Sequence, residues 1–348
     1  MAVTHPKQHS GEDPQVVADA TSGDEKAFAM LTRRYRRELH VHCYRMLASF
    51  EDAEDIVQET FLRAWQKRET YQGRASFRAW LYRIATNACI DFLEHNERRV
   101  VDISVRGSPA PDAALTPHVP WLQPYPNRLL EPSAPGDAAP DAKLVRKETI
   151  ELGFMVAMQL LPPKQRAVLI LREVLDWSAN ETADLLDSTV AAVNGALQRA
   201  RGALRDRQPN RDTYPSQASD APERERHILQ QYIEATERND PSALARTLRE
   251  DVRFAMPPEP IAYAGRDAVV GAWVQGGFGA PPFNDWRHVV TSANGMPAIA
   301  WYLRKEADGR YHPFTLDVLR VDDGEITEVT AFDLRRVRDA FGLPEELP

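Results

Sequence analysis

Apolar residues recur every three or four positions along two stretches in the first third of the chain. In residues 52–65 they are Ala53, Ile56, Val57, Phe61, Ala64 and Trp65. In residues 76–93 the same spacing runs from Phe77 to Leu93, with Ser76 placed to cap the helix. This period predicts amphipathic helices that each bury one face. Residues 20–99 are therefore predicted to fold as a helical bundle.

A second helical pattern, in residues 142–207, is typical of a helix-turn-helix. It begins with a helix opened by Leu161-Pro162-Pro163 and broken at Asp176-Trp177-Ser178. A short helix over about 180–186 and a turn at Asp187-Ser188 follow. Thr189 then caps a longer helix whose apolar stripe is Val190, Val193, Leu197 and Ala200. In this motif the last helix enters the major groove of DNA and presents its first residues to base edges. Periodicity alone also fits a plain three-helix bundle with a solvated basic face.

After residue 222 the pattern changes to alternation. Four stretches rich in β-branched and aromatic residues are predicted strands: 252–256, 298–303, 314–321 and 326–332. Asp322-Asp323-Gly324-Glu325 and Ala307-Asp308-Gly309-Arg310 are hairpin signals. Helices are predicted over residues 226–236 and from Asn239-Asp240-Pro241 to Leu248. Together these elements indicate an α+β domain over 223–348, with helices covering a curved sheet.

Proline-rich and polar stretches separate the three modules. Residues 106–141 contain nine of the 26 prolines, which have no amide donor and a fixed φ. Neither a helix nor a sheet is therefore expected to run through residues 100–141, which are predicted to be a linker. A second polar stretch, residues 208–222, marks the next boundary. The predicted modules are thus 20–99, 142–207 and 223–348.

The net charge of −8 is unevenly distributed along the chain. Residues 67–99 carry seven Lys and Arg against four Asp and Glu, and residues 188–207 carry four against one. Residues 222–348 carry 15 against 21. Because each neutralised phosphate releases counterions, two separated basic stretches suit two contacts with one nucleic acid. The acidic C-terminal part is not expected to bind nucleic acid.

Aromatic and basic residues alternate around the start of the second predicted helix. Tyr71, Phe77, Trp80 and Tyr82 lie among Arg74, Arg78 and Arg83. Rings can stack on unpaired bases while guanidinium groups hold phosphates. For any single ring, a place in the hydrophobic core is the more common outcome.

Composition excludes several classes of protein. With 43% hydrophobic and 27% charged residues and only short apolar runs, the chain is typical of a globular protein without a membrane span. The N-terminus shows no signal-peptide pattern, so the cytoplasm is the expected location. Cys43 and Cys89 alone exclude a disulfide scaffold and a four-cysteine zinc site, and both are expected to be buried thiols. No metal and no cofactor are expected.

Three segments resemble the extracytoplasmic-function (ECF) sigma factors of the sigma-70 family. Residues 52–65 (DAEDIVQETFLRAW) resemble the family's core-polymerase-binding helix, and residues 77–91 (FRAWLYRIATNACID) resemble its promoter-melting and minus-10-reading segment. Residues 161–166 (LPPKQR) with the helix-turn-helix resemble its minus-35-reading domain. Residues 120–126 (PWLQPYP) and a SnoaL-like C-terminal domain are similar to the subgroup that carries this extension.

The resemblance implies a fold and a function. The fold is multidomain: two all-α N-terminal domains, namely the region 2 bundle (20–99) and the region 4 helix-turn-helix (142–207), followed by an α+β SnoaL-like cone (223–348). The function is that of a sigma factor, which binds the clamp and flap of core RNA polymerase, recognises the minus-35 and minus-10 promoter elements and promotes DNA melting. Its partners are then core RNA polymerase and promoter DNA, with no membrane, and it is not an enzyme.

The matching motif positions imply three sets of contact residues. Polymerase docking falls on Asp52, Asp55, Gln58, Glu59 and Phe61, although a solvated helix face is the alternative for the acidic members. Minus-10 contacts fall on Arg74, Arg78, Trp80, Tyr82, Asn87 and Asp91, of which the last two can instead serve local helix contacts. Minus-35 contacts fall on Thr189, Ala192, Asn194, Gln198, Arg199 and Arg201.

The chain departs from the family pattern at four positions. Glu94 stands where a basic residue is usual, and Asn194 and Ala196 stand at usual Lys or Arg positions. Asp187 replaces the usual turn glycine. Base readout is therefore expected to depend on polar side chains such as Asn194, because Asn and Gln suit adenine edges.

Two roles stay open for the C-terminal domain. It can regulate the DNA-binding modules, because a covalently attached domain acts at high effective concentration, and activation and inhibition both fit. Alternatively it is a small-molecule sensor or an enzyme with a pocket lined by His288, Trp301, Tyr302, His312, Asp317 and Asp333. A lone His or Asp on a strand is more often a satisfied polar residue than a base.

Overall fold

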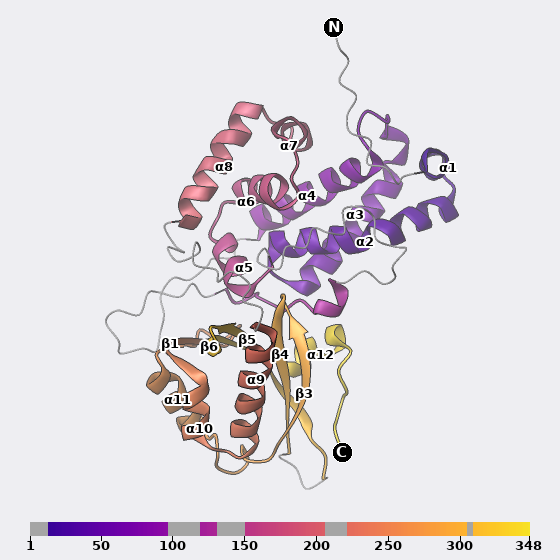
Figure 1. Ribbon diagram of the computed structural model, residues 1–348. Coiled ribbons are helices and arrows are strands. Elements are labelled where there is room, and N and C mark those ends of the chain that lie inside the picture. Colours follow the sequence, from indigo (N-terminus) through magenta and orange to yellow (C-terminus); the bar gives the residue numbers. More distant parts are fainter. Residues whose placement is uncertain (1–12, 97–118, 131–149, 206–220, 305–308) are drawn as a thin grey trace. The chain divides into compact units, whose positions relative to one another are not determined.

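The computed structural model describes residues 13–96, 119–130, 150–205, 221–304 and 309–348. The chain forms two compact units (Figure 1). The helical unit takes residues 1–99, 129–150 and 157–208, and the C-terminal unit takes residues 100–128, 151–156 and 209–348. The predicted α+β domain therefore shares its unit with two pieces of chain that come before residue 157.

Four helices build the first part of the helical unit: α1 (Pro14–Ser22), α2 (Glu25–Leu47), α3 (Phe50–Gln66) and α4 (Phe77–His95). Each begins where a side-chain oxygen accepts a hydrogen bond from a backbone amide of the first turn, which satisfies a donor that every helix start leaves open. The capping residues are Asp13, Asp24, Ser49 and Ser76. The predicted cap at Ser76 is confirmed.

The apolar stripes of these helices form the core of the bundle. In α3 the buried residues are Ala53, Ile56, Val57, Thr60 and Ala64, as the spacing predicts, whereas Phe61 and Trp65 are half-buried. Cys43 of α2 and Cys89 of α4 are both buried free thiols, as expected. Burial raises the pKa of the Cys43 thiol, so it behaves as a small apolar side chain.

The second part of the helical unit contains the predicted helix-turn-helix. Its helices are α6 (Pro163–Leu169) with a π-helical continuation (Ile170–Val174), α7 (Ala179–Leu185) and α8 (Val190–Arg205). They follow α5 (Leu152–Gln159), of which only the residues from 157 on belong to this unit. Ser178 and Glu181 form a capping box at α7. Thr189 caps α8 as predicted, because its Oγ1 accepts a hydrogen bond from the Ala192 amide at 3.2 Å.

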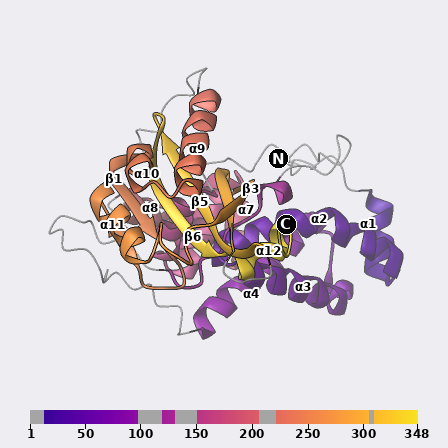
Figure 2. The ribbon, with the colours of Figure 1, turned by 90° about the horizontal axis from the view of Figure 1, so that it is seen from below.

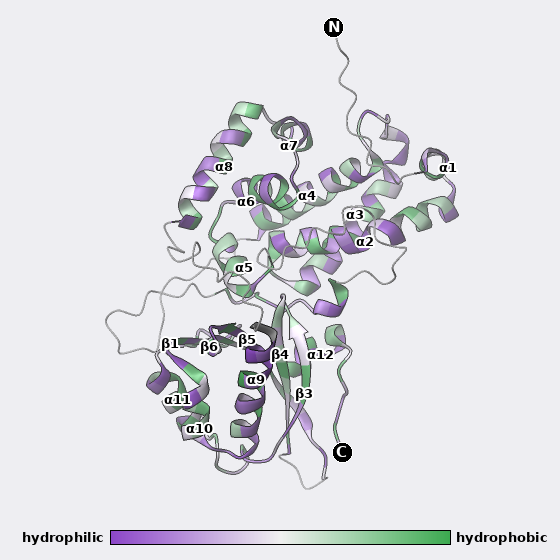
Figure 3. Cartoon of the chain, in the orientation of Figure 1, coloured by the Kyte–Doolittle hydropathy of each residue, from purple (hydrophilic) through white to green (hydrophobic). Residues whose placement is uncertain are grey.

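Hydrophobic and hydrophilic residues alternate along α8 (Figure 3). The buried residues are Val193, Leu197, Ala200 and Leu204. The prediction that Val190 belongs to this stripe is wrong, since Val190 in the first turn stays exposed. The stripe therefore begins one turn later than the sequence pattern indicates.

A six-stranded sheet forms the C-terminal unit, in the order β2-β1-β6-β5-β4-β3 (Figures 1 and 2). The strands are β1 (Leu248–Ala255), β2 (Ala262–Ala264), β3 (Trp286–Ala293), β4 (Met296–Leu303), β5 (His312–Asp322) and β6 (Glu325–Asp333). Only β1 and β6 pair in parallel among the described strands. All four predicted strands are present, whereas β2 and β3 were not predicted.

Four helices accompany the sheet: α9 (Ala221–Glu237), α10 (Pro241–Thr247), α11 (Arg266–Gln275) and α12 (Leu334–Phe341). Apolar residues of α9, α10 and α11 pack into one cluster with the strands. α12 packs against β5 and β6. The α+β prediction is confirmed, although α11 and α12 were missed.

Two tight turns organise the antiparallel strands. The predicted turn at Asp323 and Gly324 joins β5 to β6, with φ of 54° and 84°. The other predicted hairpin includes residues 307 and 308, which lie outside the described residues. A turn that was not predicted, Asn294-Gly295, joins β3 to β4 with φ of 55° and 75°. Asn-Gly between strands is a strong hairpin signal, so the sequence did contain the information.

Candidate functional site

The outer side of α3 carries the residues predicted to dock on polymerase. They are the exposed Asp55 and Gln58 and the half-buried Asp52, Glu59 and Phe61. Glu59 accepts a hydrogen bond from Arg63 at 2.6 Å, so part of its charge is already neutralised. Leu62, which the sequence reasoning did not identify, is a large apolar side chain that stays exposed. An exposed apolar side chain surrounded by polar side chains is typical of a protein-docking surface.

The helix α4 divides the predicted minus-10 residues between two faces. Trp80, Asn87 and Asp91 recur at intervals of seven and four residues, so they share one side of the helix. Asp91 is exposed and the other two are half-buried. Arg78 and Tyr82 share a different side, which packs into the bundle.

The inward side of α4 holds its polar residues in fixed contacts. Nε of Arg78 donates to Oε2 of Glu38 at 2.9 Å, and the guanidinium carbon lies 5.0 Å from the centroid of the Tyr82 ring. Tyr82 is only 1% exposed, and burial raises its pKa. Neither side chain can reach a DNA base in this conformation, whereas Arg74, in the turn before α4, is exposed.

The interleaved aromatic residues form one ring cluster at the start of α4. The centroid of Trp80 lies 5.4 Å from the centroids of both Tyr71 and Phe77. Phe77 is buried, so the core interpretation holds for that ring. Trp80 is half-buried, which leaves part of its surface for a partner.

The outer side of α8 presents the predicted minus-35 residues. Ala192, Asn194, Gln198, Arg199 and Arg201 are all exposed. Asn194, Gln198 and Arg201 recur at four and three residues and share one face. Thr189 is exposed too, but its hydroxyl oxygen serves the helix cap. Arg201 pairs with Glu173 of the preceding helix.

The two parts of the helical unit contact each other through residues of the predicted DNA-reading segments. Nη2 of Arg83, on α4, lies 2.5 Å from both carboxylate oxygens of Asp187, in the turn between α7 and α8. The ring of Trp177 lies 5.4 Å from that of Tyr82, between centroids. Asp187 has a φ of 47°, a left-handed conformation in which glycine would be unstrained.

A buried arginine connects the same two parts more firmly. Arg166 on α6 is 4% exposed and donates to the carbonyl oxygens of Gln159 and Leu161 and to Oε1 of Gln159, at 2.7–3.1 Å. It also donates to the carbonyl oxygen of Met46, in the last turn of α2. A cation there faces the negative end of the α2 dipole. These acceptors offset the cost of burying the charge.

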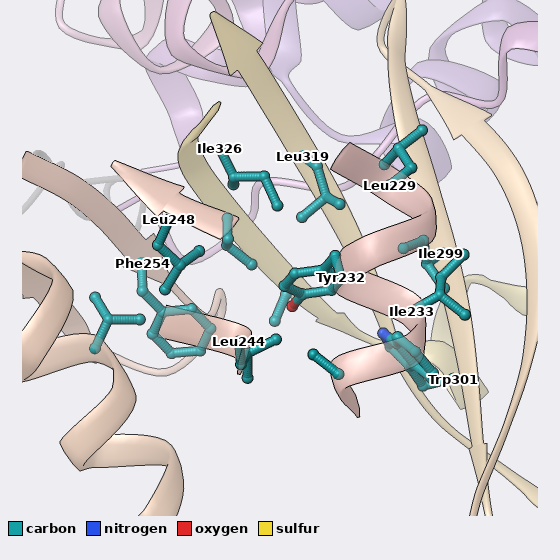
Figure 4. Packing of buried hydrophobic residues seen from close by; sticks show 14 of the residues in the cluster. Leu229, Tyr232, Ile233, Leu244, Leu248, Phe254, Ile299, Trp301, Leu319 and Ile326 are labelled. Carbon is teal, nitrogen blue, oxygen red and sulfur yellow. The ribbon is translucent and has the colours of Figure 1, made fainter. Parts of the chain in front are cut away.

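An acidic side chain, that of Asp317, lies in the interior of the C-terminal unit. Asp317 on β5 is 7% exposed, and its Oδ2 accepts hydrogen bonds from the Tyr232 hydroxyl at 3.1 Å and the Trp301 indole at 3.0 Å. Thr315 donates to Oδ1 at 3.2 Å. Burial raises the pKa of Asp317 to about 6, against these hydrogen bonds, which lower it. Tyr232 and Trp301 lie in the apolar cluster shown in Figure 4.

Of the other residues predicted to line a pocket, His288 reaches this group with its ring, whose centroid lies 5.9 Å from that of Trp301, and the rest lie in separate contacts. His288 is paired with Glu237, Nδ1 to Oε1, at 2.8 Å. The Tyr302 hydroxyl donates to the carbonyl oxygen of Pro344 at 2.8 Å, and Asp333 caps α12. His312 lies 3.6 Å from Glu346, Nδ1 to Oε1. Of the six predicted residues, only Trp301 and Asp317 are hydrogen-bonded to each other.

The described residues hold no group of three or more His, Cys, Asp or Glu side chains that could bind a metal ion. Within the same residues, each helix is too short or too polar to cross a membrane.

Three family models match the chain, one after another. Sigma-70 region 2 matches residues 31–99, Sigma-70 region 4 matches residues 152–204, and the SnoaL-like domain matches residues 229–329. The ECF RNA polymerase sigma factor SigG of Mycobacterium tuberculosis is 39% identical over 345 residues, which cover 98% of this chain and 88% of that protein. The chain belongs to the ECF sigma factors. It is thus a transcription initiation factor whose partners are core RNA polymerase and promoter DNA.

Two further comparisons delimit the shared parts of this sigma factor. The ECF sigma factor SigW of Bacillus subtilis is 30% identical over 190 residues, which cover 54% of this chain and 92% of that protein. The crystal structure of the ECF sigma factor SigJ of Mycobacterium tuberculosis has a TM-score of 0.56 at 22% identity, over 91% of this chain and 99% of that chain. The likeness to SigJ shows a shared fold. The bundle α1–α4 is hereafter region 2, and α6–α8 is region 4.

Replacing Asp317 with asparagine tests whether the role of this buried carboxyl is structural. Because its pKa is raised from 3.8 to about 6, the folded state binds the proton more tightly than the unfolded state. Protonation therefore stabilises the fold at low pH, and roughly 3 kcal/mol of this stabilisation is lost as the pH rises through 6. Asp317→Asn has no such charge and keeps an oxygen for Tyr232 and Trp301. The free energy of unfolding of this variant, measured by tryptophan fluorescence, should therefore not decrease as the pH rises through 6.

Asp333→Asn is the matched control for the pH series. The Arg335 partner lowers the pKa of Asp333, so this variant should lose stability at neutral pH and match the wild type only in strong acid. If Asp317→Asn and the wild type shared one pH profile, the structural assignment of Asp317 would be wrong.

Proposed function

We propose that three helix faces divide the work of initiation in this sigma factor. The docking face on α3 (Asp55, Gln58, Glu59 and Leu62) binds the clamp of core RNA polymerase. The α4 face (Trp80, Asn87 and Asp91) meets the minus-10 element, and the α8 face (Asn194, Gln198 and Arg201) meets the minus-35 element. One observation carries the proposal: each of these helices buries its opposite face. These side chains are therefore the ones offered to a partner.

The α4 face suits an unpaired base. Unstacking a base costs a few kcal/mol, and stacking on an aromatic ring returns about 1–3 kcal/mol. The half-buried ring of Trp80 supplies a stacking surface, while Asn87 and Asp91 supply hydrogen-bonding groups for base edges. Arg74 supplies charge for the phosphates.

The α8 face suits the major groove. The amides of Asn194 and Gln198 can each form two hydrogen bonds with an adenine. Arg199 and Arg201 supply the phosphate contacts that fix the helix in its register without reading sequence. This division matches the departures from the family pattern, because Asn194 stands where a basic residue is usual.

We further propose that the contact between regions 2 and 4 is a closed form that must open on promoter DNA. The Asp187 carboxylate accepts hydrogen bonds from the guanidinium of Arg83, which could otherwise bind a phosphate. The ring of Trp177 packs against that of Tyr82. Opening would free both α4 residues for the melted strand. The positive φ of Asp187 supports this role. Glycine would adopt this backbone conformation without strain, but it has no side chain that could pair with Arg83.

For the C-terminal unit we propose regulation without catalysis. Asp317 has a donor on each oxygen, and apolar residues of α9, α10 and α11 pack around the strands beside it. The residues predicted to line a pocket are spread over separate contacts, which gives a sensor or an enzyme no support. We infer that the protein works in the cytoplasm, where RNA polymerase transcribes.

Removing the carboxylates of the docking face should weaken polymerase binding. Asp55→Ala combined with Glu59→Ala should raise the Kd for core RNA polymerase by about tenfold, because a close interfacial charge pair contributes on the order of 1.5 kcal/mol or more. A fluorescence titration measures the Kd, and run-off transcription should fall in parallel. Glu69→Ala, which removes an exposed carboxylate just after α3, is the control. Equal affinities of the double variant and the control would contradict the docking face.

Two substitutions on α8 should separate base readout from phosphate contact. Arg199→Ala should weaken binding to all sequences and reduce the salt dependence by about one unit of slope. Asn194→Ala should cost about 1–3 kcal/mol at one base position and leave the salt slope unchanged. Binding of holoenzyme to single-base promoter variants at several salt concentrations measures both effects. Indistinguishable behaviour of the two variants would defeat the assignment.

Removing the Asp187 carboxylate should favour the open form. Asp187→Gly keeps the left-handed turn but cannot pair with Arg83, so promoter affinity should rise by up to about fivefold, the equivalent of an exposed ion pair of up to ~1 kcal/mol. An electrophoretic mobility assay measures the change. Asp184→Asn removes a neighbouring exposed carboxylate on α7 and controls for net charge. An equal gain in both variants would mean that overall charge alone is responsible.

A further inference from the structure

Polar side chains line the contact between α2 and α4 inside region 2, where the two helices pack against each other (Figure 1). On α4, Arg78, Tyr82 and Thr86 recur every four residues, so they share one face of the helix. On α2, Glu38 and His42 are also four residues apart. These five residues are named the polar seam.

The two sides of the polar seam meet in a series of contacts. Nε of Arg78 donates to Oε2 of Glu38 at 2.9 Å and to Oε1 at 3.2 Å. Nε2 of His42 lies 2.9 Å from Oγ1 of Thr86. The ring of Tyr82, in the middle of the α4 face, lies 4.9 Å from the His42 ring, between centroids. The polar seam therefore joins α2 to α4 over two turns of helix.

The polar seam places an ion pair where an apolar contact would serve the fold. The side chains of Arg78 and Glu38 are 11% and 29% exposed. Burial lowers the pKa of His42 to about 3, so this residue is neutral at physiological pH and adds no charge. Apolar side chains of similar volume are often as stabilising as a largely buried ion pair, or more so. Stability of the bundle alone therefore does not account for Glu38 and Arg78.

Arg78 also covers the ring of Tyr82. Its guanidinium carbon lies 5.0 Å from the ring centroid, within the range in which a cation is attracted to an aromatic face. The ring of Trp177, from region 4, lies 5.4 Å from the same ring. Tyr82 thus has one cover from region 4 and one from region 2 itself. Moving region 4 away leaves the cover by Arg78 in place.

Arg78 lies where a DNA phosphate can compete for it. It is in the first turn of α4, directly after the exposed turn that carries Arg74. A guanidinium binds a carboxylate and a phosphate with the same planar fork of donors. A phosphate of a strand that contacts Arg74 and Trp80 can therefore take the place of the Glu38 carboxylate.

We propose that Glu38 is a positioning residue that holds the place of a DNA phosphate. In the free protein its carboxylate keeps Arg78 over the ring of Tyr82. When the melted strand binds, a phosphate replaces the carboxylate on Arg78 and the guanidinium leaves the ring. This inference rests on the proposed minus-10 role of α4 and deepens it, because region 2 then releases Tyr82 only to a strand that brings a phosphate to Arg78.

Removing the charge of Glu38 tests the exchange. Full-length holoenzyme is titrated onto a fluorescein-labelled single strand of non-template minus-10 DNA, and fluorescence anisotropy gives the Kd. Glu38→Gln should bind about fivefold more tightly than the wild type, because the phosphate no longer displaces a carboxylate. Glu25→Gln, which removes an exposed carboxylate in the first turn of α2, should bind like the wild type. Unchanged or weaker binding by Glu38→Gln, or an equal gain in the control, would overturn the proposal.

A double-mutant cycle tests whether the gain passes through Arg78. In an Arg78→Gln background, Glu38→Gln should leave the Kd unchanged, because no guanidinium is there to be released. This double variant has an amide pair in place of the ion pair, so both positions keep hydrogen-bonding groups. The same gain in this background would show that only the loss of a negative charge matters, and the proposal would fall.

Fluorine NMR of the free chain, labelled with 3-fluorotyrosine, tests the position of Arg78 without any substitution of Arg78. The Tyr82 resonance, identified by its absence in Tyr82→Phe, should shift in Glu38→Gln because the cation leaves the ring. It should return in Glu38→Asp, which restores a carboxylate. The resonance of Tyr44, a buried residue elsewhere on α2, should not move. A Tyr82 resonance that stays in place in Glu38→Gln would contradict the positioning role.

The two proposals fail in different ways. If wild-type holoenzyme bound the minus-10 strand no better than a scrambled strand, the proposed role of the α4 face would fail. If the wild type bound this strand specifically and Trp80→Ala weakened the binding, but Glu38→Gln did not tighten it, only the role of Glu38 would be wrong.

Discussion

The burial of one apolar stripe on each of α3, α4 and α8 decides which side chains this sigma factor can offer to a partner. A helix that packs along one stripe cannot turn about its axis, so its outer residues are fixed as firmly as its core. On α3 this leaves Asp55 and Leu62 outward, and on α8 it leaves Asn194 and Gln198. The contact surfaces are therefore consequences of packing, and a residue on the inward side cannot take part without a larger rearrangement.

Tyr82 shows what that constraint means for function. The motif places it among the DNA-reading residues, but the structure buries its ring beside His42 and Trp177. A ring covered partly by region 4 becomes available only when region 4 moves. The motif and the burial are consistent if base contact belongs to an open form, and this is why the Arg83–Asp187 pair and the Trp177 ring acquire importance beyond their small individual energies.

Local signals predicted much of the fold, and contacts between distant residues account for the rest. The cap at Ser76, the break at Asp176 and the turn at Asp323 follow from the preferences of a few neighbouring residues. The inward position of Tyr82 depends on the partner helices, which periodicity does not reveal. Residues 119–128 are the clearest case: their prolines predicted a linker, yet Tyr125 is buried and its amide bonds to Asn294, in a turn 169 residues later in the chain. The residues predicted to line one pocket are spread over several contacts for the same reason, since neighbours in sequence such as Trp301 and Tyr302 point to opposite sides of a strand.

The contacts between regions 2 and 4 differ in strength. An exposed ion pair such as Arg83–Asp187 contributes about 0–1 kcal/mol and would not by itself keep two independent domains together. Arg166 adds a buried set of hydrogen bonds, but it too acts only when the regions are near each other. Because both regions belong to one chain, their effective concentration for one another is high. Weak contacts are then enough for the proposed closed form, and a closed form held by weak contacts can open when promoter DNA and polymerase bind.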